Sequence, residues 1–179
     1  MEYHDLPDQF TRDYVECALW SSNDNADDSG GDPLDNNYSV SDIEDETIED
    51  MILDCKEFQE ANAADLALVA EVSHGGHDFW LTRNGHGAGF WDRKYRQPPE
   101  IQDALDRLTE ASRRFGEYNL WVDKDDGDGI VRSEYTRAHT ARVRARRSAL
   151  PHGRCEGKRR CAEHAQDASV PSCKRHRRQ

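Results

Sequence analysis

The chain changes character after about Tyr135, and this change bounds the part that can fold around a core. Residues 136–179 hold almost no large apolar side chains beyond Val143, Leu150 and Val170. Such a segment cannot bury enough apolar surface to offset the entropy lost on ordering. We therefore predict one acidic domain over residues 1–135 and a disordered basic tail over residues 136–179.

The charge divides at nearly the same place. Residues 1–131 carry 32 acidic and 10 basic side chains, a net charge of −22, whereas residues 132–179 carry 4 acidic and 14 basic side chains, a net charge of +10. A split of this kind is typical of a folded part joined to a tail of opposite sign. Because the tail's bias toward Arg, Ser, Cys and His departs abruptly from the body, a further hypothesis is that it is a frame-shifted or non-native extension.

Three segments of the body have the apolar spacing and the end signals of helices, namely residues 6–20, 41–72 and 99–115. Ser41 and Glu44 have the spacing of a capping box at the start of the second helix. Gly116 stands where a C-terminal glycine follows the third. Residues 21–40, rich in Asn, Asp, Ser and Gly, are predicted as a loop.

The stretch HDFWLTRNGHGAGFWDR, residues 77–93, is predicted as a β-hairpin. Asn84 and Gly85 both tolerate the positive φ of a type I′ turn. In the resulting register Trp80 lies across Gly89 and near Trp91 on one face. The other face is apolar and is assigned to the core: Phe79, Leu81, Ala88 and Phe90.

Residues 118–123 and 130–135 predict a second hairpin by their alternation and aromatic content. The element order is therefore α-α-β-β-α-β-β, an α+β fold in which a small antiparallel sheet of two hairpins packs with about three helices. No apolar run approaches the roughly 18 residues of a membrane span. The opening MEYHDLPDQF has no features of a secretory signal, so we expect a cytoplasmic protein with no membrane partner.

Four stretches together resemble a family of small acidic proteins carried by bacteriophages, prophages and plasmids: YVECALWSS, PLDNNYSV, KEFQEANAADL and GHDFWLTRNGHGAGFWDR. The resemblance covers roughly residues 10–131. Members of that family are hypothetical proteins, so the resemblance implies a genetic context in a bacterial host and no particular activity. The relatives end soon after the last hairpin, and the basic tail has no counterpart in them.

The strongly negative body repels nucleic-acid phosphates and attracts basic proteins. We therefore predict a non-enzymatic accessory protein of a phage or mobile element that binds a basic host or phage protein. Acidic phage proteins of this size include DNA mimics, although acidity also serves solubility alone. The predicted partner-binding residues are the acidic cluster of the second helix, with two tryptophans as aromatic anchors: Glu44, Asp45, Glu46, Glu49, Asp50, Trp80 and Trp91.

Two other classes of function stay open. His77, His86 and Asp92 could centre a small metal-binding protein or enzyme, although the predicted register holds the two histidines apart. The arginines of the tail could bind nucleic acid. The tail also holds two spaced pairs of zinc-competent side chains: Cys161, His164, Cys173 and His176.

The five cysteines do not suggest a disulfide framework, since their number is odd and no secretory signal precedes them. Cys17 and Cys55 lie within apolar helical patterns, where we expect buried thiols that behave as small hydrophobic side chains. No cofactor is predicted.

Overall fold

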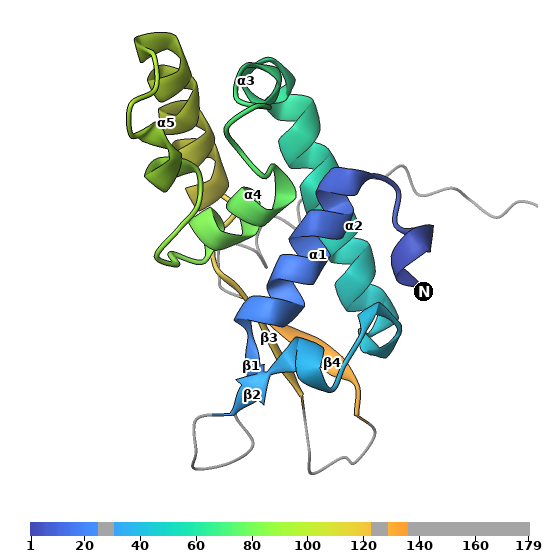
Figure 1. The fold of residues 1–179 in the computed structure, drawn as a ribbon. Coiled ribbons are helices and arrows are strands. Elements are labelled where there is room, and N and C mark those ends of the chain that lie inside the picture. The colour runs from blue at the N-terminus through green and yellow to red at the C-terminus, as the bar shows by residue number, and fades with distance from the viewer. Residues whose placement is uncertain (25–30, 123–128, 136–179) are drawn as a thin grey trace, which may run out of the picture.

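The computed structural model describes residues 1–24, 31–122 and 129–135. Five α-helices build most of this part, and in Figure 1 they stand above two small sheets. Their bounds are α1 (Gln9–Ser21), α2 (Asp45–Ala61), α3 (Ala63–Leu68), α4 (Gly76–Arg83) and α5 (Pro99–Arg113). Four short 3-10 helices precede or connect them: η1 (Tyr3–Asp5), η2 (Leu34–Asn36), η3 (Val40–Asp42) and η4 (Phe90–Lys94).

Each of the two sheets is an antiparallel pair of strands. β3 (Tyr118–Val122) pairs with β4 (Val131–Tyr135), as the second predicted hairpin requires. β1 (Asn23–Asp24) pairs with β2 (Asp32–Pro33) inside the segment predicted as a loop. The α+β class is therefore confirmed, with a minimal sheet in residues 21–40 that the turn-rich composition did not reveal.

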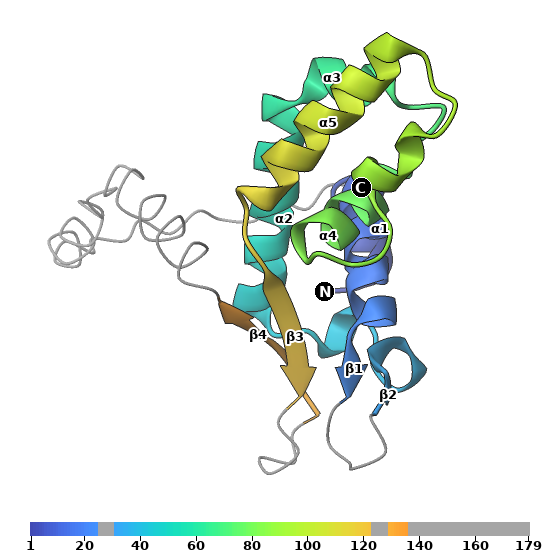
Figure 2. The same cartoon turned by 90° about the vertical axis from the view of Figure 1, so that its left-hand side faces the viewer.

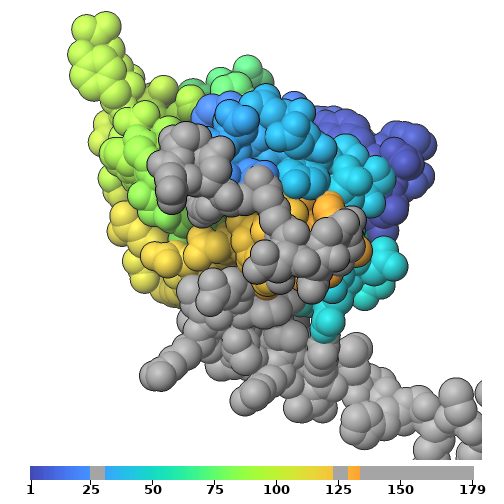
Figure 3. All heavy atoms as spheres, turned by 90° about the horizontal axis from the view of Figure 1, so that it is seen from below, coloured from blue at the N-terminus to red at the C-terminus, as the bar shows by residue number. Residues whose placement is uncertain are grey.

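The two sheets lie at the same end of the helices (Figure 2). A parallel bridge between Ile43 and Val131 joins η3 to β4, and the amide of Glu44 donates to the Val131 carbonyl at 2.9 Å. Seen from this end, orange β4 lies close to the light-blue segment that leads into α2 (Figure 3). The start of α2 is thus tied to the second sheet.

The predicted hairpin over residues 77–93 is wrong, because this segment forms α4, a loop and η4. The Asn84-Gly85 pair ends the helix and does not turn a hairpin. Gly85 has φ +68°, and the amide of His86 donates to the Leu81 carbonyl while that of Gly85 donates to the Thr82 carbonyl. These two bonds are those of a Schellman C-cap, which needs a left-handed residue just as the type I′ turn does.

α4 is buried on nearly all sides, between α1 and α5 in Figure 1. Its residues 78–83 are all buried, so the segment lacks the one-sided apolar pattern of a surface helix. Gly76 lets it approach α1 closely, because a Cβ at this position would lie 1.8 Å from the Phe10 carbonyl oxygen. Complete burial thus removed the periodic signal by which this helix could have been predicted.

The predicted core residues of the segment are nevertheless inside. Phe79, Leu81 and Phe90 are buried, and Ala88 packs against the core. Phe79 stacks on Phe58 of α2 with ring centroids 4.0 Å apart. Apolar character therefore predicted burial correctly, while the secondary structure that delivers it was not predicted.

Buried Arg83 connects four parts of the chain. Its guanidinium donates to the Tyr14 hydroxyl at 2.6 Å, to Asp54 Oδ2 at 2.9 Å and to the carbonyls of Phe115 and Gly116 at 3.2 and 2.8 Å. Burial raises the pKa of Tyr14 well above its ordinary value, so the hydroxyl stays protonated. This network is fully enclosed, and we assign it a structural role.

The predicted helices exist with shifted ends. α1 starts one turn later than expected, with Asp8 as the N-cap that accepts from the Thr11 amide at 2.7 Å. The capping box expected at Ser41 and Glu44 is instead formed by Ser39 and Asp42 around η3. The second predicted helix divides at Asn62 into α2 and α3. The third, α5, lies where it was predicted.

Candidate functional site

The acidic cluster at the start of α2 is mostly on the surface. Glu44, Asp45, Glu46 and Glu49 are exposed, and Arg132 Nε lies 3.8 Å from Glu44 Oε1. Asp50 is buried and is therefore removed from the predicted contact surface. The carboxylates in the first turn are stabilised by the positive end of the helix dipole. A four-residue acidic surface results.

The two predicted aromatic anchors have different positions. Trp80 is buried in the core, and its indole N–H donates to Ser21 Oγ at 2.7 Å. It cannot contact a partner, so this prediction is wrong; the error follows from placing Trp80 on the outer face of a hairpin. Trp91 on η4 remains exposed.

The predicted catalytic or metal group does not come together. His77 belongs to the first turn of α4, whereas His86 follows its last turn, and an eight-residue helix is about 12 Å long. Asp92 is exposed on η4. In the described residues no three His, Cys, Asp or Glu side chains form a group that could hold a metal ion. The four zinc-competent residues of the tail lie outside the described residues.

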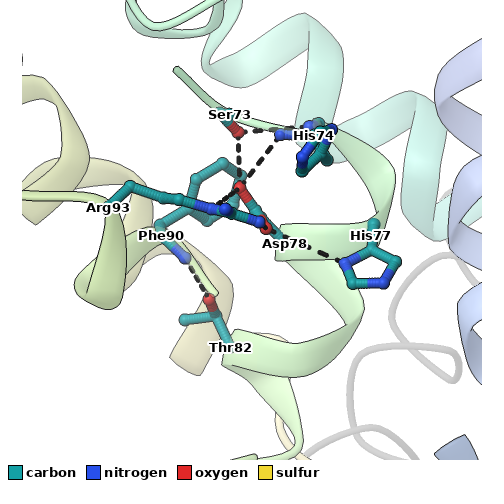
Figure 4. Close-up of polar contacts among 8 residues, drawn as sticks. Ser73, His74, His77, Asp78, Thr82, Phe90 and Arg93 are labelled. Atoms are coloured by element: carbon teal, nitrogen blue, oxygen red, sulfur yellow. Dashed lines mark hydrogen bonds and ion pairs between the residues drawn. The ribbon is translucent and has the colours of Figure 1, made fainter. Parts of the chain in front are cut away.

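A different polar cluster forms around Asp78, whose side chain is fully buried in the first turn of α4 (Figure 4). Arg93 donates a hydrogen bond to each of its oxygens, with Nη2 at 2.9 Å from Oδ1 and Nε at 3.1 Å from Oδ2. Oδ2 also accepts from Ser73 Oγ at 2.8 Å and from the His74 amide at 3.1 Å. The carboxylate thereby fixes the loop before α4 to η4.

The ionisation of Asp78 follows from these contacts. Burial alone would raise the pKa of this carboxyl, but hydrogen bonds from Arg93, Ser73 and the His74 amide outweigh it and hold the pKa below its ordinary value. A charged carboxylate that is fully committed to donors is an anchor and a poor general base. We therefore assign Asp78 a positioning role.

One more contact holds η4 in place. The amide of Phe90 donates to Thr82 Oγ1 at 3.0 Å (Figure 4). Gly89 has φ +133°, and a Cβ there would lie 2.3 Å from the same hydroxyl oxygen. The chain can make this close turn only with glycine at this position. Arg93 is thus presented to Asp78 by a rigid segment.

A cleft of about 550 Å³ opens beside this cluster. One wall is the outer face of α1, and the other comes from η2, the loop before α4, α4 itself and η4. The lining residues are Asp13, Glu16, Cys17, Trp20, Asp35, His74, His77 and Arg93. This cleft brings four charged side chains together with the rings of Trp20, His74 and His77.

The aromatic part of the cleft is a stack of Trp20 on His77. The ring centroids are 5.9 Å apart at an interplanar angle of 28°, and the Trp20 side chain is still 54 % exposed. His77 Nδ1 is buried without a hydrogen-bond partner and lies 3.9 Å from Asp78 Oδ1, too far for a hydrogen bond. His77 therefore lacks the orienting bond of a catalytic His–Asp pair.

Cys17 is the thiol that lines the cleft. Burial raises its pKa to about 12, so the sulfur is protonated at neutral pH. A protonated thiol is a weak nucleophile and a poor metal ligand. The cleft thus has the features of a binding site more than those of a reaction centre.

A second recess of about 420 Å³ shares Glu16 and Asp35 with the cleft. Leu19 and Val40 contribute its apolar surface, and Tyr3 stands at its edge. Val40, which lines the second recess, begins η3, and η3 is followed along the chain by the acidic start of α2.

The sequence did not predict this site, although it contained a signal for it. Asp13, Glu16 and Trp20 have the spacing i, i+3 and i+7, which places them on one face of α1. His74, Asp35 and Arg93 come from loops and short helices, and no periodicity connects them to α1.

None of the described helices combines the length and the apolar character that crossing a membrane requires. Comparison with protein-family models, with curated proteins and with solved structures finds no match to this chain.

Proposed function

We propose that this chain is a non-enzymatic accessory protein of a phage or mobile element, and that it binds a basic protein through its acidic surface. The genetic context is supported by the sequence resemblance. The binding function is supported by the balance of charge in the fold. Residues 1–24, 31–122 and 129–135 carry 27 acidic and 10 basic side chains.

The basic side chains of this part are mostly engaged within the fold. Seven of the ten form an ion pair with a carboxylate of the same fold, as counted over the described residues. Each of these cations lies beside a carboxylate that offsets its charge, and the remaining excess of the fold is negative. Such a field disfavours phosphate backbones and speeds the approach of basic proteins. This charge balance is the observation that carries the proposal.

The contact surface proposed here is the start of α2, with Glu44, Asp45, Glu46 and Glu49 as its exposed carboxylates. Glu44 lies beside Arg132, so the test changes the other three. Because the helical backbone is already ordered, binding costs only the side-chain freedom of these residues. Trp91 is retained as a candidate contact, since it is exposed. Trp80 and Asp50 are excluded by their burial.

The test uses a charge-neutralised variant, D45N/E46Q/E49Q, and the matched control E100Q/D103N/E117Q, whose three positions are also exposed. The tagged full chain is used to capture proteins from a bacterial lysate at low salt and at about 0.5 M salt, where screening reduces surface attraction strongly. We expect a basic protein that is captured at low salt, released at high salt, lost with the α2 variant and kept with the control.

Capture that is equal at both salt concentrations would count against the proposal. So would equal capture by the two variants, or enrichment of acidic and neutral proteins only. Thermal unfolding of each variant shows whether it is folded, because loss of first-turn carboxylates costs about 0.3–1 kcal/mol each.

A further inference from the structure

We infer that the cleft beside Trp20 binds the side chain of an arginine, presented by the basic partner. This inference rests on the proposed function and names the chemistry of its central contact. It uses residues of α1 and η2 that are distinct from the acidic cluster of α2. Charge, aromatic surface and shape each support it.

The charge of the cleft favours a cation. Asp13, Glu16 and Asp35 contribute three carboxylates to its lining. Its one lining residue with a fixed positive charge is Arg93, which is paired with both oxygens of buried Asp78. The field inside the cleft is therefore negative, and an anionic ligand is disfavoured.

The aromatic wall favours a flat cation. His77 stacks on the indole of Trp20, yet more than half of the Trp20 side chain is exposed. A guanidinium group stacks on an indole face and is attracted by its negative π surface. An ammonium group can use the same attraction but cannot stack.

The spacing of α1 places the carboxylates where a stacked guanidinium can reach them. Glu16 and Trp20 are one turn apart on the same helix face, and Asp13 lies one turn further. Carboxylates accept the parallel N–H bonds of arginine in a bidentate manner, which a lysine cannot reproduce. The combination of a π surface and a carboxylate one turn away therefore selects arginine.

The neighbouring recess provides room for the rest of the ligand chain. It adjoins the cleft at Glu16 and Asp35, and the nearly buried side chains of Leu19 and Val40 form part of its lining. An arginine in the cleft would place its flanking residues over this recess. An apolar patch beside a desolvated charged contact is the usual composition of an interface centre.

The cleft is also built rigidly. Asp78 holds the loop that carries His74 and the segment that carries Arg93, and α1 is packed along α4. A preformed wall reduces the entropy cost of binding a mobile side chain.

The test titrates ¹⁵N-labelled full-length protein with acetyl-glycyl-arginyl-glycine amide and with the same peptide containing citrulline, the uncharged isostere of arginine. The readout is the indole N–H resonance of Trp20, identified by its disappearance in W20F. We expect a saturable shift with the arginine peptide and binding at least about ten-fold weaker with citrulline, because citrulline lacks the charge.

Variant E16Q/D35N should weaken binding of the arginine peptide by at least about ten-fold, since it removes two charged acceptors. The matched control D103N/E117Q removes two exposed carboxylates elsewhere and should bind as the parent does. Equal binding of both peptides, an unaffected E16Q/D35N variant, or the absence of a Trp20 shift would each overturn the inference.

The two proposals fail separately. If the peptide leaves Trp20 unchanged while capture still depends on α2, the arginine site is refuted and the proposed function stands. If the peptide binds and no basic protein is captured, the cleft chemistry is supported and the proposed partner is refuted.

Discussion

Replacement of Asp78 by Asn should destabilise the fold strongly, because this carboxylate joins the loop before α4 to η4. Oδ2 accepts three hydrogen bonds and Oδ1 accepts a fourth. An asparagine offers one carbonyl oxygen, so its amide must face a donor of Arg93 or of Ser73. The charge that balances the Arg93 guanidinium is lost as well.

The expected cost is about 2–3 kcal/mol. Breaking a buried ion pair typically costs about 3–5 kcal/mol, but the Arg93 side chain is 28 % exposed and regains some hydration. With roughly 4 °C per kcal/mol for a domain of this size, the melting temperature should fall by about 8–12 °C. Thermal unfolding followed by circular dichroism at pH 7 measures this shift. The matched control D92N removes an exposed carboxylate nearby and should change the melting temperature by less than about 2 °C.

The pH dependence tests the cause. The folded-state pKa of Asp78 is lowered, so its contribution is complete above the unfolded value of about 3.9 and is lost as the pH falls through the folded value. The stability gap between parent and D78N should therefore narrow in acid, where the parent's carboxyl is also neutral. A gap that stays constant from pH 7 to about pH 2 would refute the electrostatic reasoning, and a loss below about 0.5 kcal/mol at pH 7 would refute the anchoring role.

Two further substitutions and one alkylation experiment test the packing of the fold. Gly76→Ala places a Cβ 1.8 Å from the Phe10 carbonyl oxygen, and a backbone atom cannot move aside. The free energy of unfolding should therefore fall by about 3 kcal/mol in a denaturant titration. A loss below about 1 kcal/mol would contradict the close crossing of α1 and α4. Gly85→Ala meets no atom within 4 Å and should cost only the roughly 1–2 kcal/mol of a left-handed φ of +68°, so a larger loss in the same titration would indicate packing there. Burial raises the pKa of both Cys17 and Cys55, so peptide mapping after alkylation at pH 8 should find them unmodified in native protein and modified in urea; rapid native labelling of either would show that its thiol is accessible.

The helices α1, α2 and α5 and the second hairpin could be predicted because their signals were periodic and local. α5 carries a regular apolar stripe between a proline and a glycine, and the sequences of residues 118–123 and 130–135 alternate as strands do. The segment 77–93 could not be predicted in this way. Asn84-Gly85 is compatible with a hairpin turn and with a helix C-cap, and the difference lies in whether Asn84 also takes a positive φ. Here Asn84 has φ −91°, and tertiary packing around α4 decides the outcome.

The candidate site was harder to predict than the fold. The acidic residues of α2 were visible as a cluster, from which burial removes Asp50, and burial also removes Trp80 as an aromatic anchor. The cleft required residues from α1, η2, the loop before α4 and η4, and their proximity follows from the packing of α4 against α1. Because α4 was predicted as a strand, His77 was assigned a strand-end position and its contact with Trp20 was missed.

The same helix, α1, explains how one surface can combine stability with recognition. Its inner face carries Tyr14 and Val15 into the core, so the position of the helix is fixed by burial and not by the ligand. Its outer face is then available for side chains that do not help folding, and Glu16 and Trp20 occupy it. In the free protein the exposed indole of Trp20 leaves apolar surface in contact with water, which is unfavourable. A large exposed aromatic ring beside carboxylates is typical of a surface used in binding. An arginine side chain would cover the indole of Trp20 and pair with Glu16 in the same contact.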